Sequence, residues 1–138
     1  MIITPAILPK SFEELIDKLF ILEGLSERVQ IDLCDGVFGL EKTWLPYKGE
    51  ELLEGFSYEF DLMVKDWRKF LPRVITLGAE RVILHVDSFT DDDVAEAIEV
   101  ARKNLIYLGL SVSNDKNVPA FAALVRKAEL SYSKVFIQ

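Results

Sequence analysis

Acidic and amide side chains stand at alternate positions of short strand-like runs, and these are the residues whose types could do chemistry. Gln30 and Asp32 are two apart in the second run, Asp61 alternates with apolar residues in the third, and His85 does so in the fourth. Residues two apart along a strand share a face, so each run presents its polar side chains to one side. A carboxylate in such a place can move a proton or bind a divalent cation. Parity therefore predicts that Gln30, Asp32, Asp61 and His85 point toward one shared polar cavity.

Oxygen ligands dominate this set, which bears on the metal that it would take. The pair of Asp32 and Asp61 suits Mg²⁺ or Mn²⁺ better than Zn²⁺, but two carboxylates rarely fix a metal firmly, so a site without any metal is the alternative. His85, the lone histidine, is as readily interpreted as a hydrogen-bonded core residue. Asp35 stands before Gly36 and is interpreted first as a turn residue.

Strand-like runs alternate with amphipathic runs along the chain, and this alternation is the fold signal. Connections long enough for a helical crossover predict a parallel sheet with sequential strand order. The turn after the first run lacks the glycines of an open-sheet nucleotide binder, which favours a barrel. The expected strands are 2–8, 29–33, 58–64, 81–86, 106–112 and 134–138. The expected helices begin at Ser11, near Glu50, at Asp66, at Thr90 and near Pro119, and Ser11 with Glu14 and Thr90 with Asp93 match capping boxes.

Composition excludes several classes of partner. The chain has 138 residues, 50% of them hydrophobic, and its 16 basic against 23 acidic residues give a net charge of −7. A nucleic acid or an anionic membrane surface calls for a basic face, so neither is expected as a partner. No run approaches the roughly 18 apolar residues of a spanning helix. Cys34 is the one cysteine, which excludes an intramolecular disulfide and favours a reducing compartment, the cytoplasm.

Several segments, taken in order, resemble the ribulose-phosphate 3-epimerase family. TPAIL is similar to the family's S-P-S-I-L, QIDLCDG to H-I-D-V-M-D-G, and FDLMV to V-H-L-M-V, while LGAERVILHVDS and YLGLSVSND track the fourth and fifth strands. The resemblance runs nearly end to end, and the order and spacing of the segments give it its weight. It implies a (β/α)8 TIM barrel that is incomplete, with about six strands and five helices forming a single domain over residues 1–138.

The resemblance also implies a reaction and its residues. The family epimerises a pentulose phosphate by metal-assisted proton transfer, so a small phosphorylated sugar is the implied ligand. Asp32 stands at the position of one acid/base aspartate. The metal positions are Gln30, Asp32 and Asp61, with Gln30 and Asp61 in place of histidines. Ala6, Met63, His85 and Ser113 stand at substrate-binding positions.

These replacements favour a degenerate epimerase and leave two rivals open. One is a non-catalytic barrel that binds a phosphosugar or a protein, because a shared fold does not guarantee a shared reaction. The other is an inactive fragment, since the partner carboxylate and the phosphate loops of such barrels would follow later strands. Unpaired edges of an incomplete sheet would then favour a homo-oligomer.

Overall fold

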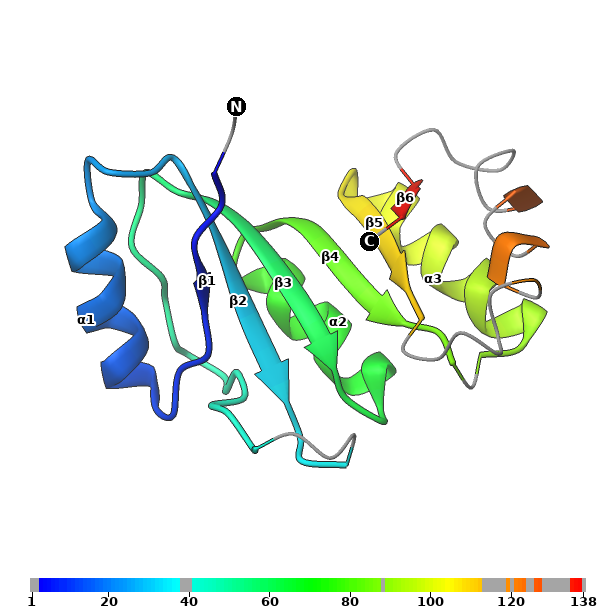
Figure 1. Ribbon diagram of the computed structural model, residues 1–138, viewed down its shortest axis with the longest axis horizontal. Helices are drawn as coiled ribbons and strands as arrows, with labels where there is room; N and C mark the ends of the chain where they lie inside the picture. The colour runs from blue at the N-terminus through cyan, green and yellow to red at the C-terminus, as the bar shows by residue number, and fades with distance from the viewer. Residues whose placement is uncertain are drawn as a thin grey trace. The chain divides into compact units, whose positions relative to one another are not determined.

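The computed structural model describes residues 3–37, 41–87, 89–112, 119, 121–123, 126–127 and 135–137. It divides into two compact units, an amino-terminal unit, Met1–Glu80, and a carboxy-terminal unit, Arg81–Gln138. The fold is α/β, with an all-parallel sheet whose strands follow the order of the chain (Figure 1). This confirms the predicted class and strand order, while closure into a barrel stays a prediction.

The amino-terminal unit is built on three parallel strands. They are β1 (Ala6–Ile7), β2 (Arg28–Cys34) and β3 (Ser57–Met63), in the order β1-β2-β3. Helix α1 (Phe12–Leu22) follows β1, and helix α2 (Trp67–Thr76) follows β3 and packs against it. The second and third strands lie within one residue of their predicted bounds, whereas β1 is much shorter than predicted.

One face of β2 and β3 supplies the core of this unit. Val29, Ile31 and Leu33 alternate along β2 and are fully buried, as are Phe60 and Leu62 on β3. Buried residues of α1 and α2 add to this apolar core: Leu15, Leu19, Trp67, Phe70, Leu71 and Val74. Each fully buried side chain of this size stabilises the fold by about 1.5–3 kcal/mol relative to an exposed one. Packing on this face leaves the other face of the same strands for polar residues.

Helix α1 begins with half of the predicted capping box. The Ser11 hydroxyl accepts a hydrogen bond from the Glu14 backbone N–H at 3.1 Å. The Glu14 carboxylate, however, accepts from the Lys10 backbone N–H at 2.9 Å instead of the Ser11 N–H. The same carboxylate also pairs with Lys18, at 2.5 Å, so it still stabilises the first turn.

The helix predicted near Glu50 is wrong, because residues 51–53 form a loop. The Glu50 carboxylate accepts hydrogen bonds from the Trp44 indole Nε1, at 3.1 Å, and from the Tyr47 backbone N–H, at 2.5 Å. Both donors precede Glu50 in the chain. Its side chain therefore stabilises the turn over residues 44–50 and does not start a helix.

The carboxy-terminal unit repeats the parallel pattern. Strand β4 (Ala79–His85), which enters this unit at Arg81, pairs with β5 (Tyr107–Ser111), and β5 pairs with β6 (Val135–Ile137). Helix α3 (Asp91–Asn104) connects β4 to β5. Of the fifth predicted helix, Pro119, residues 121–123 and residues 126–127 are helical, and the remainder lies outside the described residues.

Helix α3 has complete signals at both ends. Thr90 and Asp93 form the predicted capping box, with the Thr90 hydroxyl accepting from the Asp93 N–H at 3.2 Å and the Asp93 carboxylate accepting from the Thr90 N–H at 2.7 Å. At the other end Leu105 adopts a left-handed conformation, φ 58°, which is costly for a residue other than glycine. Among the described residues, no helix is both long and apolar enough to cross a bilayer.

Candidate functional site

The face of β2 and β3 opposite the apolar layer is polar. Asp32 lies directly across from Asp61, and Gln30 lies across from Glu59. The three carboxylates are buried, with 9% of Asp32, 8% of Asp61 and 6% of Glu59 exposed. Burying a carboxylate is costly unless it is hydrogen-bonded or paired, so this face is the feature of the unit that most requires a functional account. We call it the polar face; it comprises Ala6, Arg28, Gln30, Asp32, Cys34, Ser57, Glu59, Asp61 and Met63.

A hydrogen bond orders the centre of the polar face. The Gln30 side-chain amide donates to Asp32 Oδ1 across 2.8 Å. Asp32, Glu59 and Asp61 each make further interactions, so none of these carboxylates is without a partner. The Gln30 amide fixes one oxygen of Asp32 and thereby the orientation of the carboxyl group, as a positioned acid or base requires.

The carboxyl ends of β2 and β3 close the polar face with sulfur atoms. Cys34 Sγ lies 3.9 Å from Met63 Sδ. Burial raises the pKa of the Cys34 thiol above its usual value, and the negative charges of Asp32, Asp61 and Asp35 raise it further. The thiol therefore stays protonated at neutral pH, which argues against a nucleophilic cysteine. The carboxylates of Asp32 and Asp61 thus both lie near enough to Cys34 to act on its thiol.

The loop after β2 is anchored to the strand that bears Asp32. Buried Thr43 accepts a hydrogen bond from the Cys34 backbone N–H at 2.8 Å and donates to the Trp44 carbonyl at 3.0 Å. Asp35 has the predicted turn role, since its carboxylate accepts from the backbone N–H groups of Val37 and Lys65, at 2.9 and 2.7 Å. These bonds tie the end of β2 to its loop and to Lys65, two residues after β3, and so hold the polar face in register.

The structure brings together five of the residues that the sequence predicted for the site. Strand pairing places Ala6 across from Gln30 and Met63 across from Cys34, so Ala6, Gln30, Asp32, Asp61 and Met63 share the polar face. His85 belongs to the carboxy-terminal unit, where it is half-buried and pairs with Ser111 across β4 and β5. It also makes a further interaction. Ser113 lies outside the described residues.

The described residues do not fit a metal ion well. Within that part of the chain, no group of three or more His, Cys, Asp or Glu side chains is arranged to hold one. One oxygen of Asp32 already accepts the Gln30 amide, and the one histidine of the chain, His85, lies on β4 rather than on β2 or β3. Mg²⁺ and Mn²⁺ usually require more protein or substrate oxygens than Asp32 and Asp61 supply.

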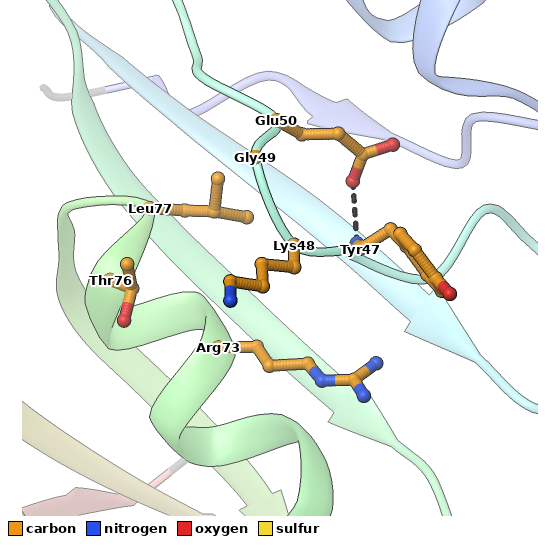
Figure 2. A pocket seen from close by; sticks show the side chains of 7 residues that line it. All are labelled: Tyr47, Lys48, Gly49, Glu50, Arg73, Thr76 and Leu77. Atoms are coloured by element: carbon orange, nitrogen blue, oxygen red, sulfur yellow. Dashed lines mark hydrogen bonds between the residues drawn. The ribbon is translucent and has the colours of Figure 1, made fainter.

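A hollow of about 320 Å³ lies between the loop before β3 and helix α2, and it was not predicted from the sequence (Figure 2). Lys48 reaches it from the loop and Arg73 from α2, while the hydrogen bond from the Tyr47 N–H to Glu50 shapes its wall. Arg73 also donates to the Pro46 carbonyl at 3.0 Å, which ties the helix to the loop. The lining residues come from two separate segments, 47–50 and 73–77, so no local sequence pattern predicts this hollow.

Comparison with known proteins adds no family to this description: no protein-family model matches the chain, and neither does any curated protein.

Proposed function

We propose that the chain is a divergent barrel of the ribulose-phosphate 3-epimerase kind, and that its polar face handles a small ketose phosphate with Asp32 as the acid/base residue. The observation that supports this most is the buried pair of Asp32 and Asp61, in register at the carboxyl ends of β2 and β3. Catalytic groups of parallel α/β barrels come from that end of the strands. A well-packed apolar sheet would place Val, Ile or Leu there instead.

The chemistry that this arrangement supports is proton abstraction next to a carbonyl. Asp32 takes the proton, the C–H bond breaks, and the electron pair moves onto the carbonyl oxygen to give an enediolate. The Gln30 amide keeps Asp32 oriented toward the substrate. Inversion needs a second acid on the opposite side of the substrate, whereas Asp61 stands beside Asp32 on the same face. The proton would then return to the side from which it left, so exchange without inversion is expected.

Solvent exchange tests this proposal directly. The full chain is incubated with ribulose 5-phosphate in D₂O, and loss of the proton signal on the carbon next to the carbonyl is followed by NMR. We expect slow exchange above the buffer rate, and its disappearance in Asp32→Asn. Asp17→Asn, an exposed aspartate on α1, removes the same charge outside the site and is the matched control. Exchange that persists in Asp32→Asn, or no exchange in the native chain, would overturn Asp32 as the base.

A second candidate, binding without turnover, is favoured by the occupied oxygen of Asp32 and by the poor fit to a metal. On this view ribulose 5-phosphate raises the melting temperature, because a ligand that binds only the folded form stabilises it. Stabilisation together with no exchange would select this candidate. Neither stabilisation nor exchange would exclude both.

A further inference from the structure

A second hollow lies at the carboxyl ends of β2 and β3, beside the loop that follows β2. Its volume is about 490 Å³, within the usual range for small-molecule pockets. Lys42, Lys65 and Lys69 line it together with Asp35 and Asp66, and Leu45 and Phe70 are among its apolar residues. We call it the lysine hollow. It belongs wholly to the amino-terminal unit.

Among the residues that the structure describes, no acidic side chain pairs with the three lysines of this hollow. Within the part of the chain that the structure describes, no ion pair or side-chain hydrogen bond reaches the ammonium of Lys42 or Lys65, and that of Lys69 only faces the Phe70 ring, at 5.3 Å. Some lysines elsewhere do have acidic partners, as Lys18 does in Glu14 and Lys103 in Glu99. Three unpaired ammonium groups around one hollow are unexpected in a chain of net charge −7.

The aspartates of the hollow do not neutralise these lysines. Both Asp35 oxygens accept backbone N–H groups, from Val37 and Lys65, so this carboxylate is committed to the turn. Asp66 stands at the start of α2 without a side-chain capping bond. Three cations against two anions leave 3 − 2 = +1 on the lining, and the ammonium groups remain available as donors.

We propose that the lysine hollow binds the phosphate group of a small phosphorylated molecule, at a site separate from the polar face. Ammonium groups are strong donors to phosphate oxygens, and several together favour a dianion over a carboxylate. Leu45 and the buried ring of Phe70 offer apolar contact to the rest of such a ligand. This inference does not depend on Asp32 acting as a base.

Inorganic phosphate is the probe for this site. The full chain is titrated with sodium phosphate, and sodium chloride is reduced in step to keep the ionic strength constant. Amide chemical shifts are followed by NMR. We expect saturable shifts at residues of the hollow. The double variant Lys65→Gln/Lys69→Gln should weaken binding about tenfold or more, since two of the three charge-assisted contacts are lost.

A charge-matched variant separates a specific site from general attraction. Lys18→Gln/Lys103→Gln changes the net charge by the same amount at lysines that are paired with glutamates. It should bind phosphate as the native chain does, and so should Asp32→Asn. Equal weakening in both double variants, or shifts that never saturate, would overturn the proposal. A native chain that binds phosphate in this way but catalyses no deuterium exchange would refute only the proposed function.

Discussion

The buried aspartates Asp32 and Asp61, which lie across from each other on β2 and β3, reduce the stability of the sheet. Like charges directly across from one another on neighbouring strands destabilise a sheet, and buried carboxylates need partners to be tolerated. Both aspartates have partners, and Gln30 supplies one of them for Asp32. Residues of this kind are retained where function requires them, at the expense of stability.

The Thr43 hydroxyl anchors the loop after β2 to the end of that strand. Thr43→Val keeps the shape of the side chain but leaves the buried Cys34 N–H without its acceptor. We expect a loss of about 1–3 kcal/mol in the free energy of unfolding, measured by urea denaturation. Thr76→Val is the control, because Thr76 is exposed and its hydroxyl donates to the Pro72 carbonyl of its own helix. Equal losses in the two variants would contradict this role.

Tyr58 should make the folding stability of the protein decrease at alkaline pH. Burial raises its pKa to about 12, from an ordinary value of 10.0, and its hydroxyl donates to the Leu53 carbonyl at 2.6 Å. The unfolded chain ionises first, so the contribution of Tyr58 is complete below pH 10 and is lost as the pH rises toward 12. That contribution is at most about 3 kcal/mol.

Tyr58→Phe should therefore lower the free energy of unfolding by about 1 kcal/mol at pH 8, because the substitution removes the hydrogen bond to the Leu53 carbonyl. Its stability should then fall less than that of the native chain between pH 10 and pH 12, as measured by urea denaturation across this range. Tyr47→Phe, which removes an exposed tyrosine, is the control. The same slope in native and Tyr58→Phe proteins would rule out this assignment.

Strand parity made one part of the candidate site predictable from sequence, namely which side chains of a strand share a face. Gln30 and Asp32 had to share a face because side chains alternate with a period of two. Parity alone does not set the register between strands, and the pairing of β2 with β3 places Asp61 across from Asp32. The bond from Gln30 to Asp32 depends on side-chain rotamers, which parity does not specify. The lysine hollow gathers residues from two loops and a helix, so only the folded chain reveals it.

At the scale of elements, prediction succeeded where a pattern had one physical solution. The second to fifth strands fall within two residues of their predicted bounds, because buried alternating runs define strands sharply. The Glu50 segment failed because a carboxylate with two nearby donors preferred side-chain bonds to helix propagation. Short turns of this kind depend on particular partners more than on periodicity.

The capping box of α3 can be tested by itself. Thr90→Ala removes the acceptor for the Asp93 N–H and should cost about 1 kcal/mol of unfolding free energy, measured by thermal or urea denaturation with circular dichroism. Thr90→Ser keeps the hydroxyl and should retain most of the stability. A Thr90→Ala variant as stable as the native chain would mean that the box contributes nothing in solution.

At the scale of the whole molecule, the order of the strands was predictable because consecutive parallel strands joined by crossovers lie beside one another. Closure into a barrel depends on strand tilt and stagger, which the hydrophobic period does not encode. The single-domain prediction likewise concerns how parts assemble, which local patterns do not determine.

The chain as a whole should show no epimerase activity. We expect no conversion of ribulose 5-phosphate to xylulose 5-phosphate, even with added Mg²⁺, Mn²⁺ or Zn²⁺, in an assay coupled to consumption of xylulose 5-phosphate. On the proposed resemblance to the epimerase family, Gln30 and Asp61 stand where that family has the imidazole ligands of its metal, whose charge stabilises the enediolate. The same metals should leave the melting temperature unchanged. Conversion that vanishes in Asp32→Asn would make the chain a working enzyme and contradict this expectation.

Leu105 offers a way to offset the instability that the polar face introduces. It holds a left-handed backbone, φ 58°, with 73% of its side chain exposed, so it contributes little packing in return for its conformational strain. Leu105→Gly would relieve about 1 kcal/mol of this strain, less what a more flexible unfolded chain costs, and Leu105→Asn would keep part of the gain. A protein engineer could thus add thermal tolerance at the end of α3 before introducing costly substitutions at Asp32 or Asp61.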